Sequence, residues 1–164
     1  AQPSGLASDG EWLYVADSEG SSIRAVPLIP DKEVWTVVGT ADLEAGRLFE
    51  FGDVDGENGK ARLQHPLGVA WHKGAIYVAD TYNNKIKAID PEKRFSITFL
   101  GTGEPGKDDD PAQFDEPAGL SVAGDKLYVA DTNNHAIRVV DLKTNSVSTL
   151  VLDGVTPPIK PEAP

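Results

Sequence analysis

The pentapeptide LYVAD at residues 13–17 returns as IYVAD at residues 76–80 and again as LYVAD at residues 127–131. A Pro-x-Gly triplet precedes each copy, at residues 3–5, 66–68 and 117–119. Internal self-similarity is typical of repeat architectures, in which each unit buries its apolar surface against its neighbours. The chain is therefore expected to fold as a series of similar units.

The hydrophobic pattern inside each unit has a period of two, which indicates β-strands. In the second copy, short apolar or alternating segments lie at residues 69–71, 76–78, 86–89 and 96–100, separated by turn-forming Gly, Asp and Asn. β-branched and aromatic residues dominate these segments, as strands prefer. Four short antiparallel strands in about forty residues are typical of a β-propeller blade.

We therefore predict an all-β fold of three four-stranded blades at about residues 2–40, 63–102 and 114–152, with loop insertions at residues 41–62 and 103–113. Propellers usually close with about four to eight blades, so three blades make only part of a ring, for which we expect six. The remaining blades either lie on further sequence or come from self-association. Four prolines in residues 153–164 indicate an extended tail.

The amino-acid composition excludes several classes of partner and chemistry. The chain has 164 residues, with 26 acidic and 15 basic side chains and a net charge of −11, which disfavours nucleic acids and anionic membranes as partners. It has no cysteine, hence no disulfide framework and no thiolate chemistry, and no apolar run long enough to span a membrane. It also has no methionine and begins directly with a repeat, so we expect a segment of a longer polypeptide. Without cysteines, the sequence does not indicate whether the protein resides in a reducing or an oxidising compartment.

The full repeat, Pro-x-Gly followed by [Leu/Ile]-Tyr-Val-Ala-Asp-Thr-x-Asn-[Asn/His]-x-Ile-[Lys/Arg], resembles the NHL repeat. The second and third copies carry it most fully, whereas residues 17–22 of the first copy depart from it. The linking phrases at residues 51–56, 63–68 and 152–158 are similar to a subgroup in which the propeller follows a thioredoxin-like domain, the NHL repeat-containing protein 2 and suppressor-of-quenching types.

This resemblance implies the last three blades of a larger propeller that acts as a non-enzymatic protein-interaction platform or scaffold beside a thioredoxin-like domain. An accessory role in a thioredoxin-like oxidoreductase, with the chemistry in a domain upstream, is the alternative. A metal-dependent NHL lyase or hydrolase is the second alternative, because NHL propellers support several functions and the fold does not decide among them.

The repeated aspartates are expected to hold turns rather than to form a carboxylate cluster, because Asp and Asn side chains bond nearby backbone groups. The predicted structural turn residues are Asp17, Asp80, Asn83, Asn84, Asp131, Asn133 and Asn134.

Metal and catalytic signals are weak. Asp53 and Asp55 lie in an acidic loop that suggests calcium, but Asn58 occupies the position where an EF-hand needs glycine. The three histidines lie at unlike positions of the repeat, which does not match a zinc site. We predict no catalytic residue and no cofactor.

Two groups of residues are candidates for contact with a partner. Phe49 and Phe51 lie in the long polar insertion, where they either pack beneath the loop, which we favour, or contact a partner. His65 is expected where the loops of a propeller approach its central channel, which makes it a candidate surface contact. Arg24, Lys87 and Arg138 share one position in the third strand of each unit, where alternation predicts outward, solvent-exposed side chains. Tyr14, Tyr77 and Tyr128 are expected to pack between blades.

Overall fold

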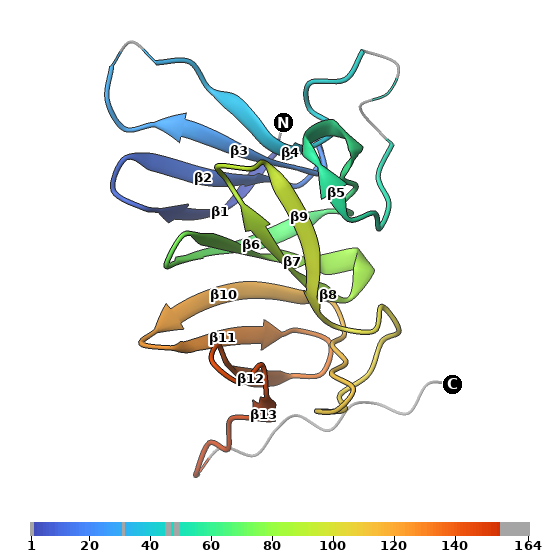
Figure 1. Ribbon diagram of the computed structural model, residues 1–164. Helices are drawn as coiled ribbons and strands as arrows, with labels where there is room; N and C mark the ends of the chain where they lie inside the picture. Colours follow the sequence, from blue (N-terminus) through green and yellow to red (C-terminus); the bar gives the residue numbers. More distant parts are fainter. Residues whose placement is uncertain (1, 31, 45–46, 48–49, 155–164) are drawn as a thin grey trace.

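Three antiparallel β-sheets stack face to face in the computed structural model (Figure 1), which describes residues 2–30, 32–44, 47 and 50–154. The first sheet contains β1 (Pro3–Ser8), β2 (Trp12–Asp17), β3 (Ser22–Pro27) and β4 (Trp35–Gly39). The second contains β6 (Pro66–His72), β7 (Ala75–Asp80), β8 (Lys85–Asp90) and β9 (Phe95–Leu100), with β5 (Gly56–Glu57) added outside β9. The third contains β10 (Pro117–Ala123), β11 (Lys126–Asp131), β12 (Ala136–Asp141) and β13 (Val147–Thr149).

The pairing of strands repeats from sheet to sheet, which confirms the predicted all-β blade architecture. Leu13 pairs with Val26 in the first sheet, and Ile76 with Ile89 occupies the same register in the second. The second sheet goes beyond the four predicted strands, because β5, from the insertion at residues 41–62, pairs antiparallel with β9. Two short 3-10 turns, η1 (Asn58–Lys60) and η2 (Thr81–Asn83), are the only helical elements of the described chain, and neither is long enough to cross a membrane.

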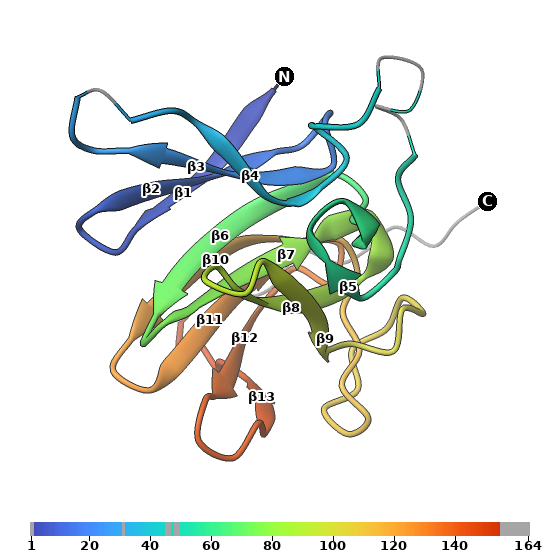
Figure 2. The same ribbon diagram turned by 45° about the horizontal axis from the view of Figure 1, so that its top comes forward.

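Short turns and long insertions emerge on opposite sides of the stack (Figures 1 and 2). The turns β1–β2, β6–β7 and β10–β11 lie together on what we call the turn side. The described parts of the two insertions lie on the other side, which we call the insertion side. Residues that are far apart in sequence but equivalent in the repeat are thereby brought to the same side.

The glycine of each Pro-x-Gly triplet allows the first strands of neighbouring sheets to approach closely. A Cβ atom built on Gly68 would lie 1.9 Å from the carbonyl oxygen of Ala118, and one on Gly5 would lie 2.4 Å from that of Leu67. Any larger residue would therefore push β6 away from β10 or β1 away from β6. Gly119 has no such neighbour: its Cβ would meet only the Ala130 side chain, at 3.5 Å.

The core lies in the two junctions between sheets. The first junction packs Tyr14, Ile23 and Val38 of the first sheet against residues such as Ile76 and Val78 of the second. The second junction contains the cluster Ala70, Ala79, Ile86, Phe114, Leu127, Val129, Val140 and Val147. Both faces of the second sheet are covered, because its alternating side chains point into one junction or the other.

Candidate functional site

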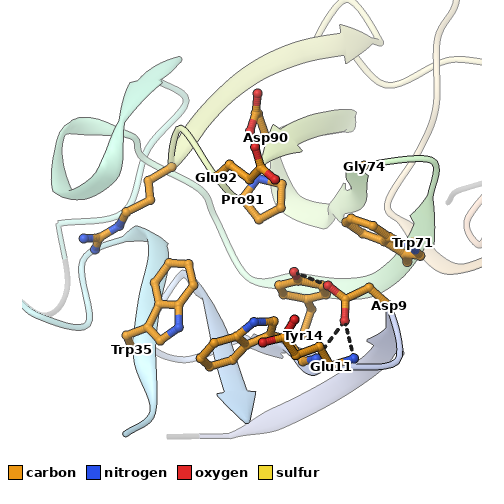
Figure 3. Close-up of a pocket in the computed structure, with 11 residues that line it drawn as sticks. Asp9, Glu11, Tyr14, Trp35, Trp71, Gly74, Asp90, Pro91 and Glu92 are labelled. Atoms are coloured by element: carbon orange, nitrogen blue, oxygen red, sulfur yellow. Dashed lines mark hydrogen bonds between the residues drawn. The ribbon is translucent and has the colours of Figure 1, made fainter. Parts of the chain in front are cut away.

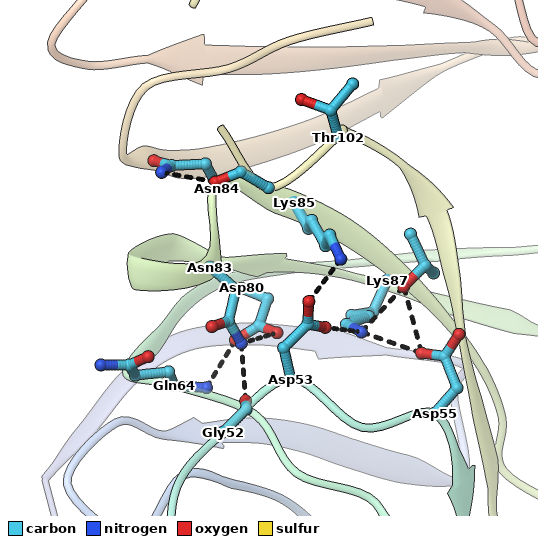
Figure 4. A network of polar contacts seen from close by, with 12 residues as sticks. Gly52, Asp53, Asp55, Gln64, Asp80, Asn83, Asn84, Lys85, Lys87 and Thr102 are labelled. Carbon is cyan, nitrogen blue, oxygen red and sulfur yellow. Dashed lines mark hydrogen bonds and ion pairs between the residues drawn. The ribbon is translucent and has the colours of Figure 1, made fainter. Parts of the chain in front are cut away.

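The repeated aspartate ties two distant points of each blade together. Asp80 Oδ1 accepts a hydrogen bond of 2.6 Å from the Gln64 backbone N–H, and its Oδ2 accepts one of 2.7 Å from Asn83 Nδ2. Figure 4 shows these bonds at the base of a larger polar network. In the third blade Asp131 accepts the equivalent bonds from the backbone N–H of Asp115 and from Asn134 Nδ2, and in the first Asp17 accepts them from the backbone N–H groups of Gln2 and Gly20. The aspartate therefore holds in place both the backbone that leads into the first strand of its blade and the turn that follows the aspartate itself.

The remaining turn residues have different partners. Asn84 has a left-handed backbone, with φ of 53°, and its Oδ1 accepts a hydrogen bond from the Glu116 N–H of the next blade. Asn133 donates from Nδ2 to Asp115 Oδ1 at 3.1 Å. These side chains connect their turns to the segment at residues 115–116, which enters the third blade.

Lys87 and Arg138 are both 0% exposed, so their predicted solvent exposure is wrong. Lys87 Nζ donates to Asp53 Oδ1 at 2.6 Å, Asp55 Oδ1 at 2.8 Å and Thr98 Oγ1 at 2.9 Å (Figure 4). Alternation predicts an outward side chain at this position, but both faces of the second sheet are covered, and the insertion at residues 41–62 contacts Lys87. Burial acts to lower the pKa of Lys87, but the hydrogen bonds to Asp53 and Asp55 outweigh it and raise the pKa above its ordinary value.

The residues equivalent to Lys87 in the other two blades also bind aspartates of the insertions. Arg138 Nη2 binds Asp109 Oδ1 at 2.5 Å, and Arg138 Nη1 binds Asp131 Oδ2 at 3.2 Å. Arg24 keeps 25% of its side-chain surface exposed and binds Asp42 at 3.3 Å. In each blade, a basic side chain of the third strand thus anchors an acidic insertion to the stack.

Asp53 and Asp55, the weak metal candidates, therefore have an ammonium group between them, and Asp53 also binds Lys85. Within the described ranges, no group of three or more His, Cys, Asp or Glu side chains converges as metal ligands would. The arrangement neutralises charge inside the stack.

Phe51 and His65 lie on the insertion side in an open aromatic cluster, whereas Phe49 lies outside the described residues. The His65 ring is 4.7 Å from the Tyr82 ring and 6.4 Å from the Phe51 ring, measured between centroids. Phe51 is 51% exposed, so the favoured prediction that it tucks beneath its loop is wrong. Glu19 Oε1 lies 3.8 Å from His65 Nε2.

A cavity of about 480 Å³ lies on the turn side of the first junction, and all three tryptophans of the protein line it. Figure 3 shows Trp35 and Trp71 on opposite sides, Tyr14 between them, and the Pro91–Glu92 turn across from Tyr14. Trp12 packs edge-to-face on Trp35, with ring centroids 5.7 Å apart, and Tyr14 stacks on Trp71 at 5.5 Å. The two sheets together therefore supply the aromatic wall of the cavity.

Carboxylates surround this wall. Asp9, Glu11, Asp90 and Glu92 line the cavity, with Arg94 as the one basic group among its lining residues. Asp9 also builds the β1–β2 turn, because it accepts hydrogen bonds from the backbone N–H groups of Glu11 and Trp12 and from the hydroxyl of Tyr14. Burial acts to raise the pKa of Asp9, but these bonds lower it below its ordinary value. Burial and the bond to Asp9 raise the pKa of Tyr14.

This cavity was not predicted from the sequence, although the sequence contains a signal for it. The three tryptophans stand at repeat positions where the other blades carry smaller or charged residues: Trp12 corresponds to Ala75 and Lys126, Trp71 to Ser8 and Val122, and Trp35 to Ile97 and Ser148. Large residues that break a repeat indicate a local function, and these three tryptophans were not among the predicted contact residues.

Residues 114–140 match the family model of the NHL repeat. Together with the stacked four-stranded sheets, this match identifies an NHL repeat within a chain of β-propeller blades.

Among particular proteins, the chain is similar to NHL repeat-containing protein 2 of Bos taurus, with 50% identity over 160 residues that cover 90% of this chain and 22% of that protein. It is 45% identical over 175 residues to SUPPRESSOR OF QUENCHING 1, chloroplastic, of Arabidopsis thaliana, covering 96% of this chain and 16% of that protein. The chain thus spans about a fifth of the length of these curated relatives. Virginiamycin B lyase from Staphylococcus aureus has a similar fold, with a TM-score of 0.58 and 13% identity over 92% of this chain and 41% of the lyase. At that identity the likeness concerns the fold alone.

Proposed function

We propose that this chain is a non-enzymatic propeller segment that acts as a protein-interaction scaffold, and that its two end faces pack against further blades of the same kind. The observation that carries the proposal is a contrast within the molecule. Residues that are buried at the two internal junctions have repeat-equivalents that lie exposed at the two ends.

The outer face of the third sheet is one such end. Ile86 of the second sheet is 0% exposed in the second junction, whereas its equivalent Ile137 is 37% exposed. Leu150 and Val151, which follow β13 on the same sheet, are 38% and 81% exposed. Gly119 is the third Pro-x-Gly glycine, and the space beside it is open where Gly5 and Gly68 meet a neighbouring first strand.

The outer face of the first sheet is the other end. Leu6 is 58% exposed, whereas its equivalent Val69 is 4% exposed inside the first junction. Val15 is half-buried, whereas Val78 is fully buried. Covering such surface is favourable by about 25 cal/mol per Å² of apolar area, so exposed faces of this composition favour association.

A second copy of the chain carries the complementary face for each end. Three blades do not close a propeller, whereas two copies joined head to tail supply six. In a longer polypeptide, other blades of that polypeptide would take the same place. Either arrangement covers Gly119 with the first strand of a following blade.

The test is the solution mass of the chain, measured by light scattering over a concentration series. We expect a concentration-dependent dimer that Gly119→Ala abolishes, because the added methyl group would meet the incoming strand. Gly52→Ala is the matched control, since its Cβ would make only an ordinary 3.4 Å contact with Arg62. A single-chain mass at every concentration would exclude self-association and leave only the blades of a longer polypeptide as partners of the end faces. Equal weakening by both substitutions would contradict packing at the Gly119 face.

An accessory role beside a thioredoxin-like redox domain is a second candidate, supported by the linking phrases at residues 51–56 and 152–158. Reading the coding sequence upstream of this segment for a Cys-x-x-Cys motif tests it. The net charge of −11 supports protein partners over nucleic acids, and the absence of salt-dependent RNA binding is the expected result.

A further inference from the structure

We infer that the tryptophan-lined cavity of the first junction binds a basic side chain, an arginine, presented by a protein partner. The inference rests on the proposed interaction scaffold and names one partner chemistry for it. Its observations are independent of those at the end faces, because the cavity lies between two sheets that the chain itself supplies.

The walls of the cavity suit a cation. A guanidinium or ammonium group over an indole ring is attracted by the negative face of the π-system, and arginine also stacks its planar group on the ring. The structure already shows this interaction on two of the three rings. Arg94 Cζ lies 5.3 Å from the centre of Trp35, and Lys32 Nζ lies 5.1 Å from the centre of Trp12.

The charge around the cavity has the complementary sign. Four carboxylates and one guanidinium line it. Glu11 is bound to Lys32 and Asp90 to Lys93, whereas the carboxylate of Glu92 accepts no hydrogen bond and forms no ion pair within the part of the chain that the structure describes. Glu92 is exposed at the entrance turn, so its carboxylate is available to an incoming cation.

The size of the cavity fits a side chain together with some of the backbone that carries it. Ligand sites commonly have volumes of about 300–1,000 Å³, and this cavity, with about 480 Å³, lies in that range. Its partly polar, partly aromatic lining favours an amphipathic occupant such as arginine, whose stem can contact the rings while the guanidinium reaches the carboxylates.

The second junction shows that the cavity is not a general product of stacked blades. On its turn side, Asp125 binds Lys73 at 2.5 Å and Lys143 at 2.7 Å, and His72 Nε2 lies 3.4 Å from the same carboxylate. Internal cations therefore already neutralise the acid there. Only the first junction combines a tryptophan wall with a carboxylate that has no partner in the described chain.

The experiment uses the fluorescence of the intact chain, since all three tryptophans report on the cavity. The chain is titrated with acetyl-Gly-Arg-Gly-amide and, as the neutral isostere, with the same peptide carrying citrulline. We expect a saturable change in tryptophan emission with the arginine peptide and an affinity about tenfold weaker for the citrulline peptide. A lysine peptide that binds more tightly than the arginine peptide, or an equal response to arginine and citrulline, overturns the inference.

Two matched variants separate the cavity from general charge. Glu92→Gln is expected to weaken arginine-peptide binding about threefold. Glu104→Gln, which removes an exposed charge on the insertion side, is expected to leave it unchanged. Equal loss in both variants would show attraction to overall charge and overturn the inference. None of these outcomes alters the dimer measurement, so the scaffold proposal and the cavity can fail separately.

Discussion

Lys87 shows how one side chain can hold a long insertion in place. Its ammonium group is fully buried, and its three hydrogen-bond partners come from the insertion and from β9 rather than from its own strand. The partners are less deeply placed, since Asp53 and Asp55 keep 35% and 42% of their side-chain surface exposed. Removing the charge of Lys87 and removing the charges of the two aspartates are therefore expected to cost different amounts of unfolding free energy.

We predict that Asp53→Asn combined with Asp55→Asn costs about 3–5 kcal/mol of unfolding free energy, because it leaves a buried ammonium without a counter-charge. Lys87→Met is expected to cost only about 1–2 kcal/mol, because methionine fills the space and water can reach the two aspartates. Urea denaturation at neutral pH measures both. The reverse order of the two costs would contradict the assignment of the buried charge to Lys87.

Asp80 gives a pH prediction. Burial raises its pKa from 3.8 to about 7, although the bonds from Asn83 and Gln64 act in the opposite direction. The native state therefore binds this proton more tightly than the unfolded state, so the contribution of Asp80 falls as the pH rises from about 4 to 7 and is constant above that. We expect the unfolding free energy to drop by about 1 kcal/mol or more between pH 5 and pH 8.

The control is Asp80→Asn, which cannot titrate. Urea denaturation of this variant at pH 5, 6, 7 and 8 should lack the part of the pH dependence that belongs to Asp80. Equal slopes in the two proteins would mean that Asp80 stays ionised throughout this range.

At the scale of elements, the repeat in the sequence was enough to predict most strands. Alternation gives the face of each residue, and the matching pairs Leu13–Val26 and Ile76–Ile89 follow from it. The partners of Lys87 and Arg138 could not be predicted, because they come from insertions of irregular sequence whose paths depend on contacts far along the chain. The tryptophan cavity depends on two sheets at once, so no single repeat reveals it.

The Pro-x-Gly glycines give a prediction at this scale. Gly68→Ala should destabilise the monomer by about 3 kcal/mol, because a carbonyl oxygen lies where the new methyl group would be. Gly119→Ala should change monomer stability by less than about 0.5 kcal/mol, because nothing but Ala130 lies near it. Thermal denaturation at low protein concentration compares the two, and similar losses would contradict the close approach of β6 and β10.

At the scale of the whole molecule, the stack is a short one-dimensional array whose second sheet is covered on both faces. Stability in such arrays depends on the interfaces that each unit makes, so the units at the ends open more readily. The number of blades could be predicted from the sequence, but which faces remain open could not. That depends on what lies next to the first and third sheets.

We predict that native-state hydrogen exchange is slowest in β7 and faster in β2 and β11, the equivalent strands of the end sheets. Raising the protein concentration should slow exchange in β2 and β11 if the end faces associate, and should leave β7 nearly unchanged. Mass spectrometry of peptic fragments resolves these strands. Uniform protection of all three strands at low concentration would contradict a stack with open ends.

The small strand β5 has a further consequence, because it occupies the outer border of the second sheet. By pairing with β9 it uses backbone groups that would otherwise be available to an extended segment of another chain. In the third sheet, β13 pairs with β12 on one side only, and no described strand pairs with its other side. Strand addition by a foreign polypeptide, whether in a specific complex or at the start of aggregation, would therefore begin at β13 or at β4, the outer strands of the end sheets, and the three-residue length of β13 limits how far it can proceed there.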